Sequence, residues 1–180
     1  SSDLKRAYSD NPLYHAFFDA CRASGHRESD DFNGRQQEGY QWHDFNVVKG
    51  RRQSTAVAFL HPAMKRSNLH VETHAHATRV LFEGKLAVGV EYDWHGTRKE
   101  ARAGREVILS GGAINSPALL QLSGIGNGEA LRDLGIPMVH DLPGVGQNLQ
   151  DHLGVYLQHE CLQPITMYRW FRPDRAVRMM

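Results

Sequence analysis

The sequence predicts an α/β fold, and three observations lead to this prediction. Residues 105–110 form a short run with an apolar centre and no alternation, which is typical of a strand buried on both faces of a sheet. This run leads into Gly111-Gly112 and then into a helix pattern for which Ser116-Pro117 is a suitable start. Upstream, three runs over 78–103 predict an antiparallel β-meander.

The first third of the chain predicts helices and turns. Asn11 and Pro12 suit the N-cap and first position of a helix, which Gly25 can end in the left-handed conformation. The run 30–34 is rich in Asp, Asn and Gly and predicts a turn. A second helix is predicted over 54–64, with a proline near its end.

The middle of the chain predicts strands. Residues 69–73 alternate between apolar and polar side chains and indicate a short strand. Residues 78–82 and 86–93 predict two more, joined by a hairpin at 83–85. Residues 97–103 can supply the third strand of the meander.

The composition argues against several classes of partner. The chain has 180 residues, of which 41% are hydrophobic, enough for the core of one domain. Its 21 basic and 20 acidic side chains leave no charge excess that would indicate nucleic acid or an anionic membrane. Cys21 and Cys161 lack the spacing of a disulfide framework, so a reducing, cytoplasmic location is expected. No run approaches the ~18 apolar residues of a membrane span, and no secretory signal is seen.

The most informative motif is the run GAINSPALLQLSGIG at residues 112–126. A small residue is followed by Ser-Pro, a pair of aliphatic residues and Ser-Gly-aliphatic-Gly. This pattern resembles the second signature of the glucose–methanol–choline (GMC) family of FAD-dependent oxidoreductases. Residues 141–152, DLPGVGQNLQDH, resemble the segment that follows it in the family. The resemblance covers residues 11 to 165 and is strongest to the choline dehydrogenase and alcohol dehydrogenase branch.

The resemblance implies an incomplete Rossmann-like domain that binds FAD. It assigns residues 1–30 to a substrate or lid region, residues 31–152 to the C-terminal portion of the FAD-binding domain, and residues 153–180 to the start of an α+β substrate-binding domain. It also implies the reaction, which is the oxidation of a primary alcohol, choline or a related one, to the aldehyde by hydride transfer to the flavin.

The resemblance assigns seven residues to the cofactor, which are Ala77, Gly111, Gly112, Ala113, Asn148, Asp151 and His152. The first would offer backbone groups to the adenine edge. The next three would let the chain pass close to the cofactor, with Ser116 capping the helix beneath it. The last three would lie near the isoalloxazine side and shape the cavity there.

Two parts of the family pattern are not found in this sequence. Family members open with a Gly-x-Gly-x-x-Gly turn after the first strand, which presents the pyrophosphate to a helix N-terminus. Their catalytic pair, a histidine with a second histidine or an asparagine, lies near the C-terminus. His152 is not that histidine, so no catalytic residue is assigned here. We therefore expect an interior segment of a longer enzyme, inactive by itself.

One group of residues suggests a metal site as an alternative. His70, Glu72, His74 and His76 share parity, so a continuous strand would place them on one face, where they could bind zinc. The strand is predicted to end near Thr73, however, which breaks the shared face. Exposed histidines and no metal site are therefore expected.

Two further patterns have a plain and a functional interpretation. Tyr40, Trp42 and Phe45 fit a ligand surface, but an ordinary core or lid contact is the simpler interpretation. Asp30 and Asp31 fit an acid–base pair, but acidic residues before Asn-Gly usually form a turn.

Other functional classes compete with the enzyme segment. A non-catalytic remnant that serves as a binding or structural module would share every sequence feature with it. A nicotinamide-dependent Rossmann enzyme is disfavoured by the absent glycine fingerprint. The expected partner is a small alcohol, with no nucleic acid, and attachment to the surface of the inner membrane is an alternative location.

The missing first strand leads to a prediction about the isolated chain. In a doubly wound fold that strand lies in the middle of the parallel sheet, so its loss exposes strand edges and apolar faces. We predict that the chain expressed alone self-associates or is poorly stable, which size-exclusion chromatography and a thermal melt would measure. A monomer with one sharp two-state transition would contradict this.

Overall fold

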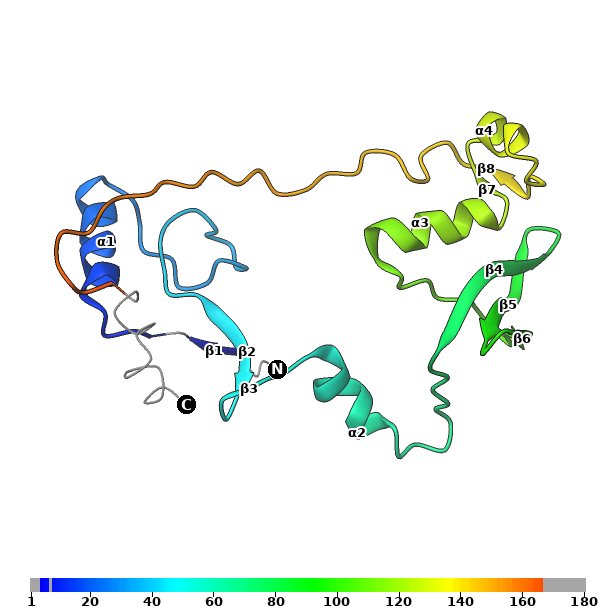
Figure 1. The fold of residues 1–180 in the computed structure, drawn as a ribbon, viewed down its shortest axis with the longest axis horizontal. Coiled ribbons are helices and arrows are strands. Elements are labelled where there is room, and N and C mark those ends of the chain that lie inside the picture. Colours follow the sequence, from blue (N-terminus) through cyan, green and yellow to red (C-terminus); the bar gives the residue numbers. More distant parts are fainter. Residues whose placement is uncertain (1–3, 7, 167–180) are drawn as a thin grey trace. The chain divides into compact units, whose positions relative to one another are not determined.

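The computed structural model describes residues 4–6 and 8–166, which fall into two compact units. One unit combines the residues up to Leu69 with those from Val155 onward, and the other is the continuous stretch His70–Gly154 (Figure 1). Helices and small sheets alternate along the chain, which confirms the predicted α/β class of an incomplete domain. Of the predicted domain 153–180, residues 167–180 lie outside the described residues.

The first unit contains a small antiparallel sheet and the predicted first helix. The sheet is formed by β1 (Leu4–Arg6), β2 (Asp44–Val48) and β3 (Arg51–Arg52), in that order. Helix α1 (Pro12–Ala23) begins as predicted, because the Asn11 side chain accepts a hydrogen bond from the backbone N–H of Leu13 at 2.9 Å. It ends as predicted too, with Gly25 at a φ of +82°.

The second predicted helix forms, with an unexpected geometry. It consists of a π-helical segment, η1 (Ala56–Leu60), followed by the short α2 (His61–Ala63). The N–H of His61 donates to the carbonyl of Ala56, five residues earlier. Because Pro62 has no N–H and its ring would collide with the carbonyl of Ala58 in an α-helix, the wider turn before it accommodates the proline.

In the first unit, aromatic residues pack against one another and the acidic pair lies in a turn. Tyr40 and Trp42 lie against Phe18, with ring centroids 5.1 and 4.9 Å apart, and Tyr40 is buried. Phe45 is exposed and does not share this contact. Asp31 accepts from a backbone N–H two residues later, as in the predicted turn. The simpler interpretation of both patterns is therefore the observed one.

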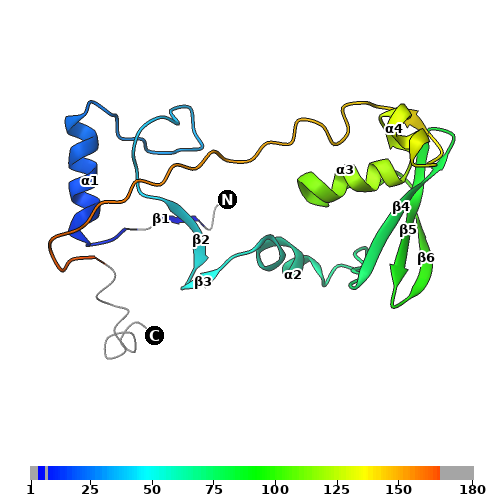
Figure 2. The ribbon, with the colours of Figure 1, turned by 45° about the horizontal axis from the view of Figure 1, so that its top comes forward.

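The second unit contains the predicted meander. Strands β4 (Ala75–Glu83), β5 (Leu86–Trp94) and β6 (Thr97–Arg102) pair antiparallel in chain order, and the hairpin between the first two lies at the predicted place. Helix α3 (Gly112–Leu122) lies beside β4 (Figure 2).

A small β-α-β unit follows α3. In it, α4 (Gly128–Asp133) connects the two parallel strands β7 (Ile125–Gly126) and β8 (His140–Asp141).

Helix α3 is joined to the meander by a buried serine. The hydroxyl of Ser123, just after α3, accepts a hydrogen bond from the backbone N–H of Val80 at 2.8 Å and donates to the carbonyl of Leu119. Ser123 and Val80 are only 5% and 4% exposed. Because β4 is an edge strand, this hydroxyl satisfies an N–H that no neighbouring strand can pair.

Two predicted strands are wrong. Residues 69–73 and 105–110 are extended or irregular and pair with no other strand in the described part of the chain. Ile108, within the run predicted to be buried on both faces of a sheet, is 76% exposed. A strand of a parallel sheet needs a hydrogen-bonded neighbour, and residues 4–6 and 8–166 supply none at these two places. Within these same residues, no helix is both long enough and apolar enough to cross a bilayer.

The Ser123 contact leads to a prediction about β4. In Ser123→Ala the buried N–H of Val80 loses its acceptor, which costs about 1–3 kcal/mol. We expect the Val80 amide to exchange with solvent about tenfold faster or more, as measured by hydrogen–deuterium exchange. Ser67→Ala, at an exposed position, is the control. Unchanged exchange at Val80 would contradict the anchoring role.

Candidate cofactor site

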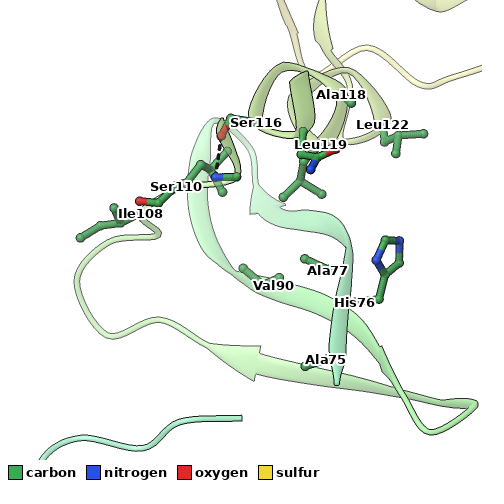
Figure 3. Close-up of a pocket in the computed structure, with 13 residues that line it drawn as sticks. Ala75, His76, Ala77, Val90, Ile108, Ser110, Ser116, Ala118, Leu119 and Leu122 are labelled. Carbon is green, nitrogen blue, oxygen red and sulfur yellow. Dashed lines mark hydrogen bonds between the residues drawn. The ribbon is translucent and has the colours of Figure 1, made fainter. Parts of the chain in front are cut away.

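The start of α3 differs from the prediction. Ser116 is not the N-cap, because the helix already begins at Gly112 and contains Ser116 and Pro117. The Ser116 hydroxyl instead accepts from the N–H of Gly111 at 2.9 Å (Figure 3). It therefore satisfies the N–H of Gly111 from inside the helix, and among the described residues the N–H groups of the first turn have no side-chain cap.

The two glycines before and at the helix start are needed for different reasons. A Cβ atom on Gly111 would lie 3.2 Å from the backbone nitrogen of Ser116 and 3.1 Å from the Cβ of Asn115, so the turn leaves little room for a side chain. Gly112 has a φ of +85°, and nothing lies within 4 Å of where its Cβ would be. The second glycine is therefore favoured by its left-handed backbone and not by a close neighbour.

A first cavity of about 630 Å³ lies between the meander and α3 (Figure 3). One wall is formed by Ala75–Ala77 of β4 and by Val90 of β5, and another by α3. The extended residues 108–111 close a further side. Ala77 and Gly111, two of the predicted cofactor residues, both line this cavity. Its walls are mainly aliphatic, with His76, Ser110, Asn115 and Ser116 as the polar exceptions.

A second cavity of about 920 Å³ lies between α3 and the loop 144–150. Two other predicted residues, Ala113 and Asn148, line it from opposite sides. Asn148 has a φ of +57°, a conformation that asparagine tolerates better than most residues. Ala118 lines both cavities, so α3 is their common wall.

Three predicted residues line neither cavity. Gly112 falls in the sequence between Gly111 and Ala113, which do. Asp151 and His152 follow the loop, where the Asp151 carboxylate accepts from the backbone N–H of His152 at 2.7 Å. Both side chains are exposed. The structure thus brings four of the seven predicted residues to two cavities that share one helix.

Sequence reasoning did not assign the residues that hold the site together. Ser123 joins α3 to β4, and Gln121 donates from Nε2 to the carbonyl of Val145 at 3.2 Å. Both belong to the motif at 112–126, so a signal was present. Their partners lie 43 and 24 positions away, which no local pattern identifies.

The alternative metal site is not assembled. His74 has a left-handed φ of +57° directly before β4, so residues 70–76 do not form one strand. His70 contacts Glu72, with Nε2 3.1 Å from the carboxylate. Within the described residues, no three His, Cys, Asp or Glu side chains are grouped to hold a metal ion.

Comparisons with known proteins agree on one family. The sequence model of the family described as "GMC oxidoreductase" matches residues 4–154. The chain is 55% identical to mouse mitochondrial choline dehydrogenase over 174 residues, which is 97% of this chain and 29% of that protein. It is 54% identical to oxygen-dependent choline dehydrogenase of Chromohalobacter salexigens, over 92% of this chain and 30% of that protein.

A solved structure shares both fold and sequence. An FAD-dependent oxidoreductase from Chaetomium thermophilum matches with a TM-score of 0.76 and 31% identity, covering 82% of this chain and 26% of that one. The chain thus spans about three tenths of the length of the curated relatives it matches.

Proposed function

Because the chain belongs to the GMC oxidoreductase family, we propose that it is a segment of an FAD-dependent enzyme that oxidises choline, or a related primary alcohol, to the aldehyde. The observation that carries the proposal is the 55% identity to a choline dehydrogenase over 97% of the chain. A non-catalytic remnant of the same family would share this identity, so the flavin-bleaching experiment below distinguishes the two.

The residues present fit the proposed cofactor. FAD joins two ring systems through an anionic pyrophosphate, and the start of α3 offers a glycine that faces free space, N–H groups and the positive end of a helix. When bound, FAD supplies the acceptor for the hydride that leaves the alcohol carbon.

Each assigned residue has a proposed task toward the cofactor. Ala77 in the first cavity would hold the adenine side, and Asn148 in the second would lie at the isoalloxazine side. Gly111, Gly112 and Ala113 would let the chain pass close to the cofactor between them. For Asp151 and His152 the support is the family resemblance alone.

The domain assignment is part of the proposal. The compact unit His70–Gly154, which contains both cavities, supports the later part of an FAD-binding portion over 31–152. Residues 1–30 are proposed as a substrate or lid region and 153–180 as the start of the substrate-binding domain, and the Asn11 side-chain amide, which donates to the carbonyl of Ile165 at 3.1 Å, supports a link between them. Residues 31–69 share their compact unit, although they were predicted to belong to the FAD-binding portion.

Inactivity, self-association and location are also proposed. We propose that the chain by itself does not oxidise alcohols, and that it self-associates. The mouse and human relatives are mitochondrial by name. For the longer enzyme we propose a cytoplasmic location, or attachment to the surface of the inner membrane.

A single methyl group tests the proposed cofactor contact. In the full-length enzyme, Gly112→Ala places a methyl group in space that FAD would occupy, so we expect at least about tenfold weaker FAD binding. Gly25→Ala is the matched control, because that glycine has a φ of +82°, also faces free space, and lies in the other unit. Both variants strain the backbone by about 1 kcal/mol. Equal FAD affinity of the two variants would count against cofactor contact at Gly112.

The reaction is tested on the same full-length enzyme. We expect visible flavin absorption bands that stay with the protein through gel filtration and that bleach when choline is added without oxygen. Bleaching by another primary alcohol but not by choline would revise the substrate. Retained flavin that no alcohol bleaches would overturn the proposed reaction.

A further inference from the structure

The loop after β8 is held to the rest of its unit by one side chain. Among the described residues, only one hydrogen bond joins residues 143–152 to any other element, and Gln121 of α3 donates it to the carbonyl of Val145. The other hydrogen bonds of these residues stay within the loop or link it to Leu142. Without Gln121, the loop would be tied to α3 by no hydrogen bond.

The Gln121 side chain is also confined by two glycines. Gly146 has a φ of +79°, and a Cβ there would lie 2.8 Å from the Gln121 Nε2. On the other side, a Cβ on Gly126 would lie 3.2 Å from the Gln121 Cγ. The backbone of the loop and that of β7 thus approach the glutamine closely, which gives its amide a defined place.

Gln121 lines the second cavity together with the loop that it holds. Ala113 lies on the helix side of that cavity and Asn148 on the loop side. We propose that Gln121 is a positioning residue, which fixes the loop 144–150 relative to α3 and thereby places Asn148 against the flavin. This inference rests on the proposed function and adds to it a residue that need not touch the cofactor.

The proposed role requires a hydrogen-bond donor at a given reach. The carbonyl of Val145 can only accept, so a side chain of similar length without a donor loses the contact. Methionine is such a side chain. Lysine has a comparable reach and carries a donor, so it should restore the contact.

The test uses the full-length enzyme. In Gln121→Met we expect the FAD dissociation constant to rise about fivefold, as for one lost hydrogen bond, and the visible circular dichroism of the bound flavin to change. Gln121→Lys should recover both. The control is Gln36→Met, which removes the same kind of bond, from Nε2 to the carbonyl of Glu38 at 3.0 Å, in the other unit. That variant should match the wild type in both measurements.

A second pair of variants serves if Gln121→Met does not fold. Gly146→Ala pushes a methyl group against the Gln121 amide, whereas Gly135→Ala, at a φ of +70°, meets nothing within 4 Å. The two substitutions strain the backbone alike. A difference in FAD affinity between the two variants is therefore due to the methyl group that displaces the Gln121 amide. We expect the weaker affinity for Gly146→Ala.

The outcomes separate the two proposals. A wild-type enzyme that holds no FAD would overturn the proposed function, and the positioning role with it. If the wild type holds FAD, and Gln121→Met leaves the dissociation constant and the dichroism unchanged, only the positioning role is overturned. Equal losses in Gln121→Met and Gln36→Met would overturn it as well.

Discussion

The hydroxyl of Ser123 joins the end of α3 to the edge of the meander, and both cavities depend on where that helix lies. It accepts from Val80 on β4 and donates to Leu119 within its own helix. β4 forms one wall of the first cavity, and α3 forms a wall of both cavities. The Ser123 contact therefore joins two walls of the first cavity and holds the helix that also lines the second. A buried, fully paired hydroxyl suits this task, since any shift would leave a polar group unsatisfied.

The candidate site follows from having one helix between two recesses. Gly111 lines the first cavity and Ala113, two positions later, lines the second, so one helix terminus borders both. A cofactor with two ring systems and an anionic link needs two such recesses and a positive helix end. The family that matches residues 4–154 is the GMC oxidoreductase family.

Local signals predicted the elements that local contacts stabilise. The Asn11 cap, the turn after α1 and the hairpin of the meander were all predictable, because the deciding residues lie within a few positions of one another. Residues 69–73 and 105–110 were predicted wrongly, because a strand depends on a neighbour and an apolar run does not say where the neighbour is. At the site, the motif located Gly111 and Ala113, whereas the role of Gln121 depends on the distant Val145.

The two hydrogen bonds of the Asn11 side chain form at different moments of protein synthesis. Its oxygen caps α1 through Leu13, which leaves the ribosome almost together with it. Its amide nitrogen must wait for Ile165, 154 residues later. The unit His70–Gly154 is continuous and can complete its own contacts in that interval. The unit with both cavities is therefore translated before Ile165, while the Asn11 side chain of the first unit still lacks that partner.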